Sequence, residues 1–204
     1  VMHLVDKVLR KILPDFIGSE GDYSSILMKF LSGKYYGELC DRLRTLRSEI
    51  DRIMAQRKLV DYLIEYIILL GRLSGLLHDI GHPPFSHVTE ELFEALLNLE
   101  RPAKMKFHEI LGFKVLTESI ELNEVFTKIN QRISNIVAGA FYEVLSDVIK
   151  SILSINGEII ATVIFFGDNF YRKMNLHTKI PLSLDAIHLL HKVLNSDIDT
   201  DRMD

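Results

Sequence analysis

The feature that most constrains the fold is a long apolar run in the first half of the chain. Leu59–Leu77 is almost continuously hydrophobic, and its only charged residues are Asp61, Glu65 and Arg72. A run of this length that carries three charges suits a helix buried on most sides better than a membrane span. We therefore expect a central helix around which the rest of the chain packs.

The segment that follows this run, Leu76–Glu91 (LLHDIGHPPFSHVTEE), breaks the helix. Its two consecutive prolines cannot continue a helix, because proline lacks the amide hydrogen and clashes with the preceding turn. His78 and Asp79 are therefore expected in the last helical turn. A tight turn then presents His82, and a new helix begins near Ser86.

The adjacent His78 and Asp79 combine two kinds of metal ligand. Imidazole is a borderline ligand and carboxylate a hard one, so the pair suits Zn, Mn or Fe, and Mg to a lesser degree. An isolated His-Asp dipeptide has little meaning by itself. Here the string H-D-I-G-H-P-P-F-S-H adds His82 and His87 around a glycine–proline break, which predicts a metal site.

This string closely resembles the central motif of the HD-domain phosphohydrolases, HD-x-G-H-x-P-F-S-H, in the branch of the deoxynucleoside triphosphate triphosphohydrolases. The resemblance implies an all-α fold, the HD-domain helical bundle. It also implies a divalent metal cofactor (Mn, Mg, Zn or Fe), and hydrolysis of a (deoxy)nucleoside triphosphate to a nucleoside and tripolyphosphate. His78 and Asp79 are metal ligands by this resemblance.

The resemblance assigns further residues. The C-terminal D-T-D-R-M-D is similar to the family's D-x-D-R-x-D segment, which makes Asp201 the next metal ligand and Arg202 a cation beside the phosphates. His87, paired with Glu90 one helical turn on, is the implied general acid for the leaving 5′ oxygen. The remaining two implied catalytic residues, which contact the α-phosphate, are His82 and His108.

His108 lies in Phe107-His108-Glu109, which is predicted to open a helix that extends through Leu116. Glu109 near the start of a helix is favourable for the helix dipole and needs no catalytic role. Ile159–Phe166 (IIATVIFF) is ambiguous, because its β-branched residues favour a strand while the resemblance favours a helix; we expect a helix. Of the other histidines, His3 is interpreted as a helix-face residue, and His188 and His191 as surface or core-packing residues on one face of a helix.

The domain organisation is predicted as a single HD domain over residues 1–204, clipped at both ends. In the family, the first histidine ligand lies in a segment just before the first helix, and Val1–His3 resembles the continuation of that segment. At the other end, the D-T-D-R-M-D segment stops before the tyrosine of the family motif. Residues 34–58 are interpreted as a helical insertion, because they exceed what a minimal HD domain needs. An apolar seam over Leu39–Ile53 makes this insertion either a packed arm or a contact in a homo-oligomer.

The overall composition narrows the cellular setting. A single cysteine rules out an internal disulfide and fits a reducing compartment. The net charge of −4 gives no overall attraction to nucleic acid or to anionic membranes, although a local basic site for a nucleotide remains allowed. With an amphipathic N-terminal segment in place of a leader, we expect a cytoplasmic protein with a nucleotide substrate and no membrane partner.

Two other functions remain open. A different HD-domain hydrolase would share the metal core and act on nucleoside monophosphates or cyclic dinucleotides, but those branches generally lack the P-F-S-H-x-x-E extension present here. A non-catalytic nucleotide-binding or interaction module is the second alternative, with the Leu39–Ile53 seam as its contact. The presence of every local motif residue argues against this second alternative.

Overall fold

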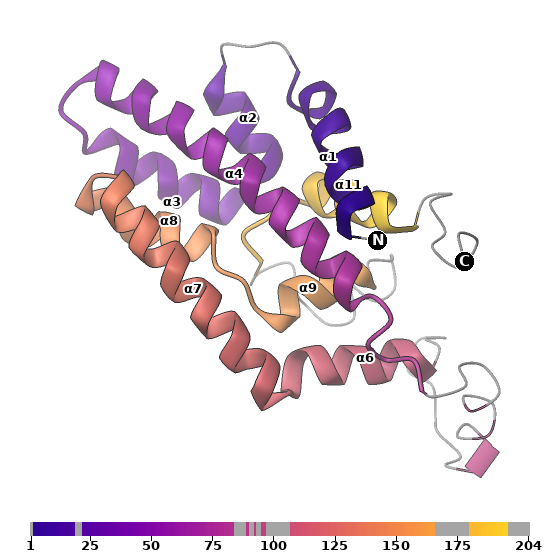
Figure 1. Ribbon diagram of the computed structural model, residues 1–204. Helices are drawn as coiled ribbons and strands as arrows, with labels where there is room; N and C mark the ends of the chain where they lie inside the picture. Colours follow the sequence, from indigo (N-terminus) through magenta and orange to yellow (C-terminus); the bar gives the residue numbers. More distant parts are fainter. Residues whose placement is uncertain are drawn as a thin grey trace.

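The computed structural model describes residues 2–18, 22–83, 107–165 and 180–195, together with four single residues between 89 and 96. Within these residues the regular elements are all α-helices, and one isolated antiparallel bridge joins Leu31 to Leu182. The all-α fold predicted from the resemblance is confirmed. The helices, labelled as in Figure 1, are α1 (Met2–Ile17), α2 (Tyr23–Phe30), α3 (Gly33–Arg44), α4 (Glu49–Leu77), α6 (Phe107–Glu118), α7 (Ile120–Ala140), α8 (Glu143–Ile152), α9 (Gly157–Ile164) and α11 (Leu184–Asn195).

Helix α4 is the central element, and it crosses the middle of the molecule in Figure 1. It packs against α1, α2, α3, α9 and α11. The apolar run Leu59–Leu77 forms its C-terminal part, in which Leu63, Ile67 and Leu70 are completely buried. Each such aliphatic side chain contributes about 1.5–3 kcal/mol by its removal from water. Among the helices that the structure describes, none is both long enough and apolar enough to cross a membrane.

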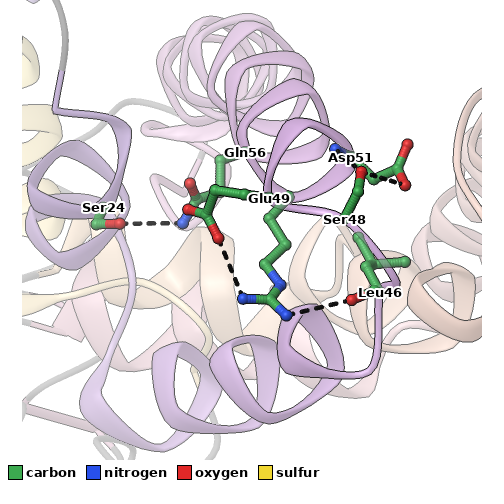
Figure 2. Close-up of polar contacts among 7 residues, drawn as sticks. Ser24, Leu46, Ser48, Glu49, Asp51 and Gln56 are labelled. Atoms are coloured by element: carbon green, nitrogen blue, oxygen red, sulfur yellow. Dashed lines mark hydrogen bonds and ion pairs between the residues drawn. The ribbon is translucent and has the colours of Figure 1, made fainter.

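The start of α4 is capped by polar side chains (Figure 2). The Ser48 hydroxyl accepts a hydrogen bond from the backbone amide of Asp51 at 3.0 Å and donates one to its carboxylate at 2.7 Å. The guanidinium of Arg52 donates to the Glu49 carboxylate at 3.1 Å and to the carbonyl oxygen of Leu46 at 3.3 Å. The Ser48 contact satisfies one of the amides that a helix start leaves unpaired, and the Arg52 contact with Leu46 joins α4 to the turn that follows α3.

Residues 34–58, predicted as a helical insertion, belong to two elements, because α3 ends at Arg44 and α4 begins at Glu49. Helix α3 packs against α8. The first part of the predicted seam is therefore buried within this chain, whereas Ile50 and Ile53 are 74% and 44% exposed. The buried seam residues are Leu39, Leu43 and Leu46. A homo-oligomer through this region stays a prediction.

The segment with the ambiguous strand pattern is helical. Helix α9 covers most of Ile159–Phe166, and Asn156 caps it by accepting from the Ile159 amide at 2.9 Å. Residues 159–164 of α9 are all buried, and the helix packs against α4, α6 and α11. Burial on every side explains why the sequence shows a continuous apolar run and no helical periodicity.

The N-terminal helix is longer than the sequence indicates. A proline inside a helical pattern usually ends the helix, but α1 continues through Pro14 to Ile17. The Gly18 amide donates to the Pro14 carbonyl oxygen at 3.0 Å, and Gly18 itself adopts a φ of 84°. Glycine adopts the left-handed backbone conformation readily, so the helix ends at Gly18 and not at the proline.

Candidate metal and phosphate site

The His78–Asp79 pair lies where the buried helix α4 ends. Leu77 is the last helical residue, and His78 is the C-cap, with φ −60° and ψ −33°. The pair was predicted in the last helical turn; it lies immediately after it, with Asp79 in the turn that follows the cap. Nε2 of His78 lies 2.8 Å from Oδ2 of Asp79, and the side chains are 27% and 54% exposed. Two potential metal ligands thus converge at the solvent-facing end of a rigid core helix.

The ring of His78 is held from behind by its own helix. Its Nδ1 lies 2.9 Å from the carbonyl oxygen of Gly75, one turn earlier. Because a carbonyl oxygen only accepts, Nδ1 carries the hydrogen of this bond, and Nε2 is directed at the Asp79 carboxylate. This is the arrangement in which a metal-binding histidine is normally oriented.

The donor chemistry of this pair fits one side of a divalent-metal site, since one imidazole nitrogen and one carboxylate oxygen are a usual ligand combination. Within the described part of the chain, no group of three or more histidine, cysteine or acidic side chains is close enough to hold a metal. The third predicted ligand, Asp201, lies outside the described residues.

A tight turn after α4 brings His82 back toward Asp79. The amide of Ile80 donates to the Leu77 carbonyl oxygen at 3.1 Å, and the amide of His82 donates to the Asp79 carbonyl oxygen at 2.9 Å. As a result, Nε2 of His82 lies 3.6 Å from Oδ1 of Asp79. The turn, which was predicted from the two prolines, therefore brings His82 to the carboxylate of Asp79, which also pairs with His78.

Helix α6 adds the fourth residue of the site. His108 lies in its first turn, and its ring is stacked on that of His82, with 4.1 Å between centroids and 21° between planes. Glu109 lies in the same first turn, where the helix dipole favours an acidic side chain. The structure thus gathers His78, Asp79, His82 and His108 from two segments that are far apart in the sequence.

The contact between these two segments is made through glycine backbone. A Cβ atom added to Gly81 would overlap the carbonyl oxygen of His108 and the amide of Gly112, and would lie 2.7 Å from the Gly112 Cα. The sequence reasoning did not identify Gly112. A glycine one turn after His108 in a helix interior, where glycine is unfavourable, is the signal that would have pointed to it.

The remaining predicted site residues cannot be placed. His87, Glu90 and Arg202 lie outside the described residues, as does Asp201, so their roles stay predictions. The histidines interpreted as helix-face, surface or core-packing residues are on α1 and α11, in helices other than those that carry the site. Of these, His3 and His188 are exposed, and Nδ1 of His191 lies 3.0 Å from the carbonyl oxygen of Val163.

Comparison with known proteins identifies one family and several relatives. The HD domain family matches residues 67–180. A deoxynucleoside triphosphate triphosphohydrolase SAMHD1 homolog of Dictyostelium discoideum is 31% identical over 97 residues, which are 48% of this chain and 15% of that protein. Deoxynucleoside triphosphate triphosphohydrolase SAMHD1 of Danio rerio is 38% identical over 56 residues, 28% of this chain and 8% of that protein.

A third relative, an HD domain-containing protein of Acanthamoeba polyphaga mimivirus, is 33% identical over 96 residues, 42% of this chain and 20% of that protein. The matches thus cover at most a fifth of the length of these three relatives. No solved structure matches the chain.

The family match covers more than half of the chain. It begins within α4, so it contains the His78–Asp79 pair, the turn at Gly81 and the whole of α6. The elements that build the candidate site are therefore the elements that the family shares. This chain belongs to the HD domain family, and it is similar within that family to the deoxynucleoside triphosphate triphosphohydrolases.

Proposed function

We propose that this chain carries the catalytic site of a metal-dependent phosphohydrolase that splits (deoxy)nucleoside triphosphates into a nucleoside and tripolyphosphate. The observation that carries the proposal is the convergence of His78 Nε2 and Asp79 Oδ2, 2.8 Å apart, beside the stacked rings of His82 and His108. The similarity to the two triphosphohydrolases of Dictyostelium discoideum and Danio rerio supports the substrate class.

In this proposal His78, Asp79 and Asp201 hold one divalent cation, which is Mn, Mg, Zn or Fe. When bound, such a cation lowers the pKa of a bound water toward neutrality and offsets the charge of a phosphate. The Gly75 carbonyl keeps the His78 ring in one tautomer, so the ligand is oriented before any cation binds. This arrangement reduces the reorganisation that binding requires.

The stacked histidines are proposed to bind the α-phosphate. His82 and His108 each offer a ring N–H to a phosphoryl oxygen, and their stacking at 4.1 Å keeps the two donors side by side. Fixed donors aimed at oxygens that gain negative charge stabilise the transition state more than the ground state. Because His82 also lies 3.6 Å from the Asp79 carboxylate, the phosphate would be bound next to the metal ligands.

The chemical step adds one water across the bond between the α-phosphorus and the 5′ oxygen. The water oxygen bonds to the α-phosphorus and becomes part of the tripolyphosphate, and the bond to the 5′ oxygen breaks. We propose that His87, oriented by Glu90, donates a proton to that leaving oxygen, which gives the 5′-hydroxyl of the nucleoside. Arg202 is proposed to bind the phosphates.

The test is a product analysis of the full-length protein with Mn²⁺ or Mg²⁺. The substrates are a panel of deoxynucleoside and nucleoside triphosphates, nucleoside monophosphates and cyclic dinucleotides. We expect tripolyphosphate from triphosphates, in place of pyrophosphate or single phosphate, and no product from the His78→Ala/Asp79→Ala variant. Turnover of monophosphates or cyclic dinucleotides alone would assign a different HD hydrolase. No turnover of any substrate would leave the binding-module alternative.

A further inference from the structure

We propose that Gly112 is a positioning residue, whose missing side chain lets α6 approach the turn at Gly81 closely enough to stack His108 on His82. The inference rests on the proposed function in one respect, because that function gives the stacked pair its role at the phosphate. The positional part of the inference concerns only the contact between two segments of the chain, and it can be tested without any substrate.

From the side of the turn, the approach is as close as backbone allows. A Cβ on Gly81 would overlap the carbonyl oxygen of His108 and the amide nitrogen of Gly112, and would lie 2.7 Å from the Cα of Gly112. All three are backbone atoms, so no side chain can rotate away to make room. The turn therefore rests directly on the first two turns of α6, and this contact requires glycine at position 81.

On the helix side, the space around Gly112 is small, and a larger side chain there is more crowded than a smaller one. A Cβ on Gly112 would lie 3.4 Å from the Cα of Gly81, at the edge of ordinary contact, and 2.9 Å from Cζ of Phe165. Alanine is thus accommodated only if the Phe165 ring shifts slightly. The two γ-carbons of valine need still more space, and we expect α6 to gain it by moving away from the turn at Gly81 and from the Phe165 ring.

The other end of α6 is held by a second close contact. Gly157, at the start of α9, lies so near α6 that an added Cβ would overlap the carbonyl oxygen of Leu116. Leu116 itself is completely buried. A helix held at this end relieves crowding at Gly112 by moving its N-terminal end, and that end carries His108.

His108 lies four residues before Gly112, so both are on the same face of α6. A displacement of α6 away from Gly81 therefore moves the His108 ring away from His82. The distance between the ring centroids, 4.1 Å in the structure, then increases and the stacking is lost. A misplacement of about 1 Å at a substrate-positioning group can lower the rate about 100-fold. The expected consequence is a fall in kcat that grows with the size of residue 112.

The experiment compares Gly112→Ala and Gly112→Val with two controls in the full-length protein. Leu116→Ala removes buried atoms from the same helix and destabilises it without adding atoms at the turn. Gly139→Ala makes a glycine-to-alanine change in α7, where an added Cβ meets nothing within 4 Å. The first measurement is the NMR spectrum of the histidine rings in metal-free protein, with the signals assigned through His82→Gln and His108→Gln.

Stacked rings shift each other's proton resonances, so we expect the His82 and His108 signals to move partly in Gly112→Ala and fully in Gly112→Val. Both controls should keep the wild-type ring shifts. The second measurement is kcat with the preferred substrate, expected to fall roughly 10- to 100-fold in Gly112→Val. In contrast, Mn²⁺ affinity should stay within about twofold of wild type, because His78 and Asp79 belong to α4 and its turn.

Unchanged ring shifts in Gly112→Val would overturn the inference. It would also be overturned if Leu116→Ala, at an equal loss of thermal stability, lowered kcat as much as Gly112→Val does. If Gly112→Val does not fold, the partial shift expected of Gly112→Ala decides the question. If wild-type protein hydrolyses no triphosphate, the proposed function fails, but the ring shifts still decide whether Gly112 positions His108.

Discussion

Nδ1 of His78 lies 2.9 Å from the carbonyl oxygen of Gly75, in the central helix α4. This hydrogen bond links the candidate metal site to the core, because Gly75 is itself buried between packed helices. The ring is thereby kept in one tautomer, with Nε2 toward Asp79. The stability of α4 and the geometry of the site are therefore connected.

Replacement of His78, a proposed metal ligand, should strongly weaken metal binding. Loss of a group that merely orients a ligand costs about 10- to 100-fold in metal affinity, so we expect His78→Ala to weaken Mn²⁺ binding by more than about 100-fold. Titration calorimetry measures this affinity. His3→Ala is the matched control, because His3 is an exposed histidine on α1. Equal Mn²⁺ affinity in the two variants would exclude His78 as a ligand.

Removal of the metal should stop hydrolysis without unfolding the protein. The core of α1, α4, α9 and α11 consists of apolar side chains and needs no ion. We expect chelation to leave the far-ultraviolet circular dichroism unchanged. Mn²⁺ at about 100 times its Kd should add about 2.7 kcal/mol of stability, which raises Tm by about 5–10 °C. A similar rise in the His78→Ala/Asp79→Ala variant would show that Mn²⁺ binds elsewhere.

A buried tyrosine should contribute to stability through one hydrogen bond. The Tyr66 hydroxyl donates to the carbonyl oxygen of Ser154 at 2.6 Å, and its side chain is nearly inaccessible. Tyr66→Phe should lower the free energy of unfolding by about 1–1.5 kcal/mol in a urea titration. Tyr142→Phe is the control, because Tyr142 is 52% exposed although it donates to Asp51. An equal cost in both variants would contradict the role of burial.

The same tyrosine predicts instability at alkaline pH. Burial raises the pKa of Tyr66 above its ordinary value of about 10. The unfolded chain therefore loses the Tyr66 proton first, so the stabilisation is complete below about pH 10 and is lost as the pH rises above it. The free energy of unfolding, measured between pH 9 and 11, should fall more steeply in wild type than in Tyr66→Phe. Parallel curves would refute this prediction.

A half-buried histidine, His191, should lower stability at acidic pH. Burial lowers the pKa of His191 below its ordinary value of about 6.5, and the neighbouring His188 acts in the same direction. The unfolded chain therefore takes up a proton before the folded chain does, so stability falls as the pH drops below about 6.5. We expect the urea midpoint to depend less on pH between 7 and 5 in His191→Gln than in His3→Gln, and identical slopes would count against it.

The cap of α4 should affect stability without affecting catalysis. Ser48 accepts from the Asp51 amide at 3.0 Å, and Ser48→Ala removes this cap at a cost of about 1 kcal/mol. His78 lies at the opposite end of a helix of 29 residues, a distance of about 40 Å. We expect kcat to remain unchanged at temperatures where the variant is folded. Ser48→Asp should restore the stability, because aspartate is an equally good cap.

Local patterns predicted much of the fold. The helical arrangement of Leu59–Leu77 and its end at His78 follow from apolar content and from prolines, which act on the backbone within a few residues. The break between α3 and α4 was not predicted, because the seam over Leu39–Ile53 reads as one continuous helical pattern. In the structure Arg52 binds the Leu46 carbonyl oxygen across that break, a contact that no periodicity encodes.

The sequence by itself determined which side chains stand at the end of the central helix, because adjacency and helix termination are local properties of the backbone. It therefore predicted the His78–Asp79 pair as a unit. Only the tertiary structure decided that His108 stacks on His82, because this depends on how closely α6 packs against the turn at Gly81. That approach requires that Gly81 carry no side chain, because a Cβ there would overlap backbone atoms of His108 and Gly112, which belong to a distant part of the sequence.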